Sequence, residues 1–132
     1  MAAADAPPSI VIDVNTGKVL ESNNSAALWH PASVTKLMTA YVVFAALKTG
    51  KLSLETPVVM SKWAADQPAS KMYFTPGTTM TMDNALKMML VKSANDMAVA
   101  VAEAVGGTQE QFVAMMNAQA KALGMNSTQY IN

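Results

Sequence analysis

The residues best suited to chemistry in this sequence are a serine and a lysine three positions apart, Ser33 and Lys36. On a helix, positions i and i+3 share a face, so the lysine amine can reach the serine hydroxyl. A serine becomes a strong nucleophile only when a base takes its proton, and a lysine acts as that base when burial lowers its pKa. The pair therefore predicts acyl transfer through a serine nucleophile. The alternative is a solvated surface lysine, because this spacing also arises by chance.

The segment that follows the pair favours the catalytic interpretation. Residues 37–47 leave almost no polar face, so the predicted helix over residues 33–48 should be buried at the centre of a domain and should desolvate Lys36. Pro31 before this helix and Gly50 after it suit a helix start and stop. Ser33 would then lie at the helix N-terminus, where unpaired N–H groups and the positive end of the dipole stabilise an oxyanion.

Ser93-Ala94-Asn95 is a second polar element, placed between two predicted helices. A short loop there can project side chains into a cleft. We expect Ser93 to relay or share a proton, and Asn95 to hold a substrate carbonyl or the lysine. The alternative is an ordinary helix cap, since Ser and Asn both favour that position. Residues 22–24 have the same Ser-x-Asn spacing, but they end a predicted hairpin and are interpreted as a turn.

The elements around these motifs are predicted to be mainly helical. Residues 9–14 and 18–22 are β-rich and flank a Gly-containing turn, which predicts a hairpin, and residues 57–60 could form a short strand. Three further helices are expected from caps and stop signals: 84–91 capped by Asp83, one opened by Asn95 or Asp96 and reaching residue 105, and one from the capping box at Thr108 to Gly124.

Composition excludes several classes of function. The chain has 132 residues, which suits one domain, and 52% are hydrophobic while 14% are charged. Nine basic and nine acidic residues cancel, so no basic field would attract nucleic acid. With no cysteine and a single histidine, His30, no disulfide and no metal site are expected. The 12 methionines are expected to fill the core.

The segment around the serine and lysine, Pro31-Ala-Ser-Val-Thr-Lys-Leu-Met-Thr-Ala-Tyr41, resembles the active-site segment of the bacterial serine D-Ala-D-Ala carboxypeptidases, which are penicillin-binding proteins. Ser93-Ala-Asn-Asp96 resembles their second motif, and similarity continues through residues 112–117 and 121–125 to Asn132. The resemblance implies an α+β fold. The part of that fold in this chain would be a helical cluster with an N-terminal β-hairpin. It would be an incomplete penicillin-binding or serine β-lactamase-like transpeptidase fold, which lacks its later sheet strands.

By this resemblance, Ser33 is the acylated nucleophile, Lys36 its general base, Ser93 a proton-transfer residue and Asn95 a substrate-positioning residue. The implied substrate is a peptidoglycan stem peptide ending in D-Ala-D-Ala, and β-lactam antibiotics such as penicillins would acylate the same serine. No cofactor and no metal are implied.

The resemblance also implies a periplasmic or other exported location at the cell envelope. Residues 1–8 have no basic region and no apolar region, so they are not an intact signal peptide. We expect them to be the disordered N-terminus of a mature chain, and residues 9–132 to be the N-terminal portion of a D-Ala-D-Ala carboxypeptidase catalytic domain.

The third motif of this chemistry, Lys-Thr-Gly, is not expected to function here. Lys48-Thr49-Gly50 has the right residues, but it lies at the far end of the helix that starts at Ser33, roughly 22 Å away at about 1.5 Å per residue. We interpret it as a helix C-terminus and expect impaired activity, because the opposite wall of the cleft is not encoded.

Two alternatives stay open. One is a non-catalytic fragment that binds peptidoglycan or a partner, with self-association through an uncovered sheet edge. The other is a serine β-lactamase, in which a carboxylate such as Glu103 or Glu110 would activate the deacylating water.

Overall fold

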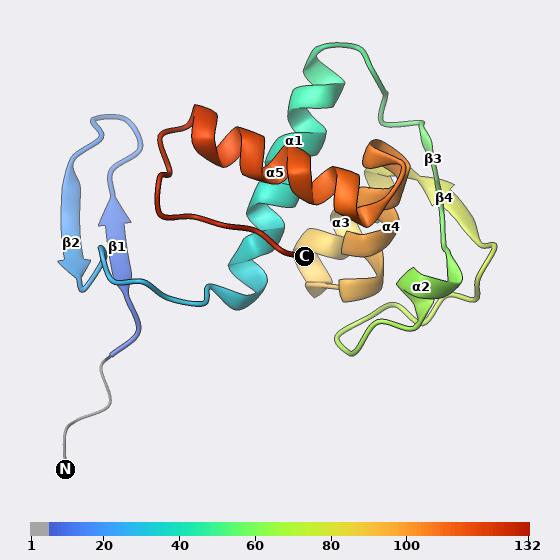
Figure 1. Cartoon of the computed structure of the whole chain (residues 1–132), viewed down its shortest axis with the longest axis horizontal. Coiled ribbons are helices and arrows are strands. Elements are labelled where there is room, and N and C mark those ends of the chain that lie inside the picture. Colours follow the sequence, from blue (N-terminus) through green and yellow to red (C-terminus); the bar gives the residue numbers. More distant parts are fainter. Residues whose placement is uncertain (1–5) are drawn as a thin grey trace. The chain divides into compact units, whose positions relative to one another are not determined.

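The computed structural model describes residues 6–132, so the expectation of disorder for residues 1–8 falls largely outside the described part. The chain divides into two compact units, Met1–Pro31 and Ala32–Asn132. Within the described residues, the first unit holds a β-hairpin and the second holds a cluster of helices with one small sheet (Figure 1). The predicted α+β class is confirmed.

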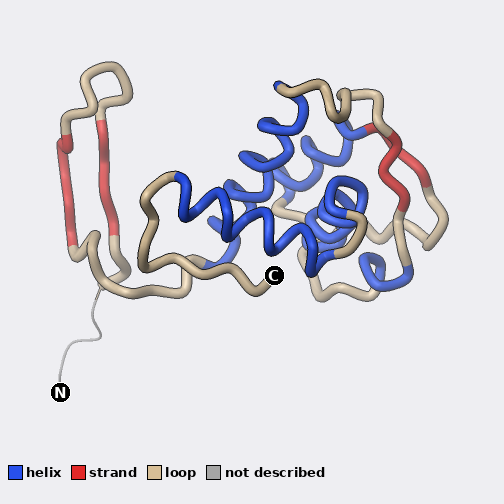
Figure 2. Tube along the Cα trace, turned by 45° about the horizontal axis from the view of Figure 1, so that its top comes forward, coloured by secondary structure: helices blue, strands red, loops and turns tan. Residues whose placement is uncertain are grey.

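The hairpin consists of β1 (Ser9–Ile12) and β2 (Val19–Asn23), which pair antiparallel as predicted (Figure 2). The connection is closed by the carboxylate of Asp13, which accepts hydrogen bonds from the backbone N–H groups of Asn15 and Thr16 at 2.8 and 3.0 Å. The N–H groups of Thr16 and Asn15 lower the pKa of the Asp13 carboxyl, because they stabilise its charged form. The turn therefore depends on a charged side chain.

The second unit contains the two motifs. Its elements in chain order are η1 (Ala32–Val34), α1 (Thr35–Lys48), β3 (Pro57–Val59), α2 (Lys62–Ala65), β4 (Thr79–Thr81), α3 (Met82–Lys92), α4 (Asn95–Gly106) and α5 (Gln109–Ala122). Strands β3 and β4 pair antiparallel and lie at the edge of the helical cluster (Figure 2).

Helix α4 is the centre of this unit, and it packs against α1, α2, α3, α5 and β3. It can do so because the sequence from Met97 to Ala102 is apolar on almost every face. Its C-terminal Gly106 lies so close to α5 that an added Cβ would come within 2.8 Å of Phe112. Methionines fill much of the remaining core, as predicted, and five of them are fully buried: Met60, Met82, Met89, Met97 and Met116.

The helix predicted over residues 33–48 is present, but it differs from expectation in two ways. Its first residues form the 3-10 turn η1, so Ser33 precedes α1. Its burial is also one-sided, because α3, α4 and α5 pack on only part of its surface. Three large apolar side chains that were expected to be buried are exposed in the described chain: Leu37, Tyr41 and Phe44.

Of the other predicted helix boundaries, the start of α3 differs from the prediction, whereas the start of α5 and the end of α1 agree with it. Thr81, and not Asp83, caps α3, since its hydroxyl accepts a hydrogen bond from the N–H of Asn84 at 3.3 Å. Thr108 caps α5 as predicted. Helix α1 ends at Lys48, with Gly50 at φ 72°, which confirms Lys48-Thr49-Gly50 as a helix terminus.

Two features are absent from residues 6–132. None of the helices there is both long and apolar enough to cross a membrane. The same residues contain no cluster of three or more His, Cys, Asp or Glu side chains that could hold a metal ion.

Candidate active site

Ser33 of the first motif and Asn95 of the second come together at the amine of Lys36. Its Nζ lies 3.2 Å from Oγ of Ser33 and 2.7 Å from Oδ1 of Asn95, and it donates a hydrogen bond to each. Ser33 comes from η1, Lys36 from the first turn of α1, and Asn95 from the start of α4. The packing of α1 against α4 therefore brings into contact two residues that are 59 positions apart in the sequence.

Lys36 is partly buried, and this burial lowers the pKa of its amine, because desolvation disfavours the ammonium form. A neutral amine has a lone pair that can accept a proton. In the neutral form, one N–H of that amine can stay on the oxygen of Asn95 while the lone pair turns to the hydroxyl of Ser33 in place of the N–H donated in the charged form. The cluster is thus arranged to take a proton from a serine.

Ser93 lies two residues before Asn95, in the turn between α3 and α4. It ends α3 in the left-handed conformation, with φ 57° and ψ 36°, which costs a non-glycine residue about 1–2 kcal/mol. Ser93 is thus the C-cap of α3, whereas Ala94 is the N-cap of α4, so neither Ser93 nor Asn95 occupies the N-cap position that the alternative interpretation assumed. Ala32, next to Ser33, also has a positive φ of 51°. Backbone strain of this kind concentrates at functional sites.

A loop that the sequence analysis did not assign to the site holds Asn95 in place. This loop, residues 66–78, connects α2 to β4. The carbonyl of Pro68 accepts a hydrogen bond from Nδ2 of Asn95 at 2.9 Å, and the carbonyl of Ser70 accepts one from its backbone N–H at 2.7 Å. Because Nδ2 is engaged by the loop, the amide of Asn95 must direct Oδ1 towards Lys36.

Asp96 is a second residue whose position the sequence analysis did not foresee. The sequence places it at a helix start and at the end of the second motif without a role of its own, and in the structure it is completely buried. Its Oδ2 accepts hydrogen bonds from the N–H groups of Met72 and Tyr73 at 2.8 and 3.2 Å, and its Oδ1 accepts one from Met97 at 2.8 Å. A sequence signal existed, since Asp96 directly precedes the apolar run 97–102 of α4, and a carboxylate that is buried with such a run needs hydrogen-bond donors.

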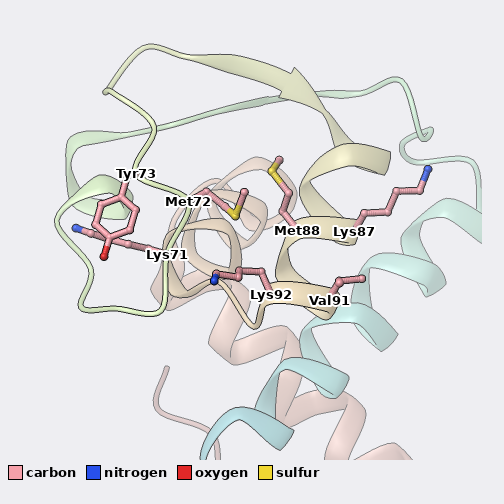
Figure 3. Close-up of a pocket in the computed structure, with 7 residues that line it drawn as sticks. All are labelled: Lys71, Met72, Tyr73, Lys87, Met88, Val91 and Lys92. Carbon is pink, nitrogen blue, oxygen red and sulfur yellow. The ribbon is translucent and has the colours of Figure 1, made fainter.

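Two hollows in the surface lie apart from this cluster. One of about 520 Å³ is lined by residues of the 66–78 loop and of α3: Lys71, Met72, Tyr73, Lys87, Met88, Val91 and Lys92. Figure 3 shows Lys71 and Tyr73 at one end of it and Lys87 at the other. The second, of about 380 Å³, is lined by Glu103 and Glu110 together with Trp63, Gly107, Thr108 and Gln109. Neither hollow is lined by the four predicted site residues.

Solved structures share this architecture. D-alanyl-D-alanine carboxypeptidase DacD from Francisella tularensis matches with a TM-score of 0.91 and 40% identity, over 98% of this chain and 32% of that chain. A penicillin-binding protein from Listeria monocytogenes, solved in its cefotaxime-bound form, matches with a TM-score of 0.82 and 29% identity, over 100% of this chain and 53% of that one. The helical cluster with its hairpin is therefore part of the penicillin-binding protein fold.

Sequence comparison identifies the family. The family model described as D-alanyl-D-alanine carboxypeptidase matches residues 1–132. DacF from Bacillus subtilis is 39% identical over 130 residues, which is 98% of this chain and 33% of that protein. DacC from Escherichia coli is 39% identical over 134 residues, or 97% of this chain and 34% of that protein. The chain belongs to the D-alanyl-D-alanine carboxypeptidase family of serine peptidases, and it spans about a third of the length of these relatives.

Proposed function

We propose that this chain carries the acylation half of a D-Ala-D-Ala carboxypeptidase site, with Ser33 as the nucleophile. The observation that carries the proposal is the position of the Lys36 amine, 3.2 Å from Oγ of Ser33 and 2.7 Å from Oδ1 of Asn95. The names of the relatives support the substrate, a peptide that ends in D-Ala-D-Ala.

The proposed reaction has two halves. Neutral Lys36 takes the proton of the Ser33 hydroxyl while Oγ attacks the carbonyl carbon between the two D-alanines. The C–N bond of the resulting tetrahedral adduct breaks, the proton passes to the departing amine, and the terminal D-Ala leaves. Ser93 relays that proton, and Asn95 holds both Lys36 and the substrate. Water then hydrolyses the ester on Ser33 and regenerates the hydroxyl.

β-Lactams would enter the same reaction, because opening their ring forms the same serine ester. The cefotaxime-bound relative supports this part of the proposal. Peptidoglycan stem peptides, exposed at the cell envelope, are the natural source of D-Ala-D-Ala ends, so an exported location follows from the proposed substrate.

Intact-mass measurement after incubation with benzylpenicillin tests the proposal. The complete gene product that carries this segment should gain the mass of one penicillin, and Ser33→Ala should gain none. Ser127→Ala is a matched control, because it removes an exposed serine hydroxyl outside the cluster. An adduct that persists in Ser33→Ala would refute the assignment of the nucleophile.

A chain that ends at Asn132 should react more slowly than one that continues into a Lys-Thr-Gly motif. Loss of one oxyanion donor typically costs about 10²- to 10³-fold in rate. The Lys-Thr-Gly motif would belong to the opposite wall of the cleft, so its absence should lower the rate at least as much. Full-rate hydrolysis of a D-Ala-D-Ala peptide by the isolated segment would contradict this expectation.

A non-catalytic binding role is the second candidate, and the exposed apolar side chains of α1 favour it: Leu37, Tyr41 and Phe44. An apolar surface of this kind promotes association with a partner or with a second copy. Light scattering on the isolated segment distinguishes the cases, because a monomer at high concentration would count against self-association.

A further inference from the structure

Asp96 is a buried charged residue that the proposed reaction does not use. It follows Asn95 directly, its side chain is completely buried, and all of its hydrogen bonds come from backbone N–H groups. Two of these donors, Met72 and Tyr73, are successive residues of the 66–78 loop and lie more than 20 positions away in the sequence. The carboxylate thus links the start of α4 to that loop.

The same loop holds the amide of Asn95. Pro68 and Ser70 accept hydrogen bonds from the side chain and the backbone of Asn95, and Oγ of Ser70 donates to the carbonyl of Lys92 at 3.2 Å. Hydrogen bonds therefore run from Asp96 through the loop to Asn95, and from Asn95 to the amine of Lys36.

We propose that Asp96 is a positioning residue for acylation, which clamps the 66–78 loop against α4 and thereby fixes Asn95 and the amine of Lys36. This inference rests on the proposed function, because it assigns a role within that reaction. Asp96 touches neither the nucleophile nor the base, so its effect passes through Asn95.

The chemistry of the clamp requires a carboxylate. Successive backbone N–H groups that converge on one point favour an anion, and hydrogen bonds to a charged acceptor are about twice as strong as neutral ones. Tyr73 is also held at a positive φ of 63°, a conformation that persists in a non-glycine residue only when its surroundings enforce it. Oδ2 of Asp96 provides that restraint.

The substitution Asp96→Asn tests the inference in the complete gene product, with the acylation rate constant for a fluorescent penicillin as the readout. It keeps the shape of the side chain but removes the charge and one acceptor oxygen. Loss of alignment at the base should lower the rate constant about 10- to 100-fold. Because Asp96 acts through Asn95, the double variant Asp96→Asn/Asn95→Ala should react at the rate of Asn95→Ala alone.

Two further variants keep the test decisive. Asn117→Ala is the matched control, because the Asn117 side chain clamps the backbone of Tyr130 at 2.8 and 2.9 Å. It should lower the melting temperature and leave the acylation rate unchanged. Ser70→Ala removes a weaker anchor of the 66–78 loop at an exposed position, so it should fold even where Asp96→Asn does not. It should lower the rate constant about 2- to 10-fold.

The outcomes separate the two levels of the proposal. Wild-type protein that is never acylated would refute the proposed function and this inference with it. Acylated wild type, together with unchanged rates in Asp96→Asn and Ser70→Ala, would refute the inference alone. The double variant gives a third outcome. If its loss of rate equals the product of the losses in Asp96→Asn and Asn95→Ala, Asp96 does not act through Asn95, and the inference is overturned.

Discussion

The contact between Lys36 and Asn95 makes a quantitative prediction for the substitution Asn95→Asp. Its carboxylate would lie at the position of Oδ1, 2.7 Å from Nζ. The Coulomb energy of such a pair is about 1.5 kcal/mol in bulk water and about 6 kcal/mol at an effective dielectric constant of 20. Lys36 is only partly buried, so we take about 1.5–3 kcal/mol. That energy stabilises the ammonium form and lowers the neutral fraction of Lys36 about 10- to 100-fold at a fixed pH below its pKa.

Acylation by a fluorescent penicillin, followed from pH 6 to pH 10 in the complete gene product, measures this effect. The rate constant of Asn95→Asp should be about 10- to 100-fold below wild type at neutral pH and should recover as the pH rises. Asn117→Asp makes the same chemical change where the side chain contacts Tyr130, and its profile should follow wild type. An equal loss of rate that persists above the pH at which the wild-type rate levels off would refute the reasoning, because it would show that Asn95 does not act on the charge of Lys36.

Three other measurements test the site and the fold. The wild-type acylation rate should rise with pH and level off below pH 10.5, because the reaction needs the neutral amine and burial lowers the pKa of Lys36 from that value. A plateau reached only above pH 10.5 would contradict this expectation. Gly106→Ala should destabilise the protein by about 1–3 kcal/mol in urea, since its Cβ would lie 2.8 Å from Phe112, and an unchanged midpoint would count against that close approach. Thr108→Ala should cost about 1 kcal/mol through the lost cap of α5, with Thr128→Ala, an exposed threonine outside the helix, as its control.

The local parts of the site could be predicted from the sequence. Ser33 and Lys36 lie three positions apart, and helix geometry alone brings them within reach of each other. The caps and stops of α1 and α5 were also predictable, because Thr108 and Gly50 act through their own backbone neighbours. The family resemblance then predicted site roles for Ser93 and Asn95, because the spacing of these two residues alone does not distinguish an active site from a helix cap.

The supporting part of the site could not be predicted, because its contacts are long-range and follow no period. Pro68 acts through its carbonyl, a group that every residue has, so no residue type identified it. The short elements α2 and β4 have too few residues for a periodic pattern. The exposed side of α1 was also missed, since apolar composition shows that a helix can be buried but not which neighbours cover it.

The separation of Lys36 and Asn95 by 59 positions has a consequence for folding. Helices form within about a microsecond, whereas contacts between distant segments wait for slow loop closure. A chain that has formed all of its helices, but in which α1 has not yet packed on α4, would have the serine but would lack a lysine whose pKa is lowered by burial. We therefore expect a β-lactam to label only molecules whose tertiary structure is complete, so acylation during refolding would report the last step of assembly while circular dichroism reports the first.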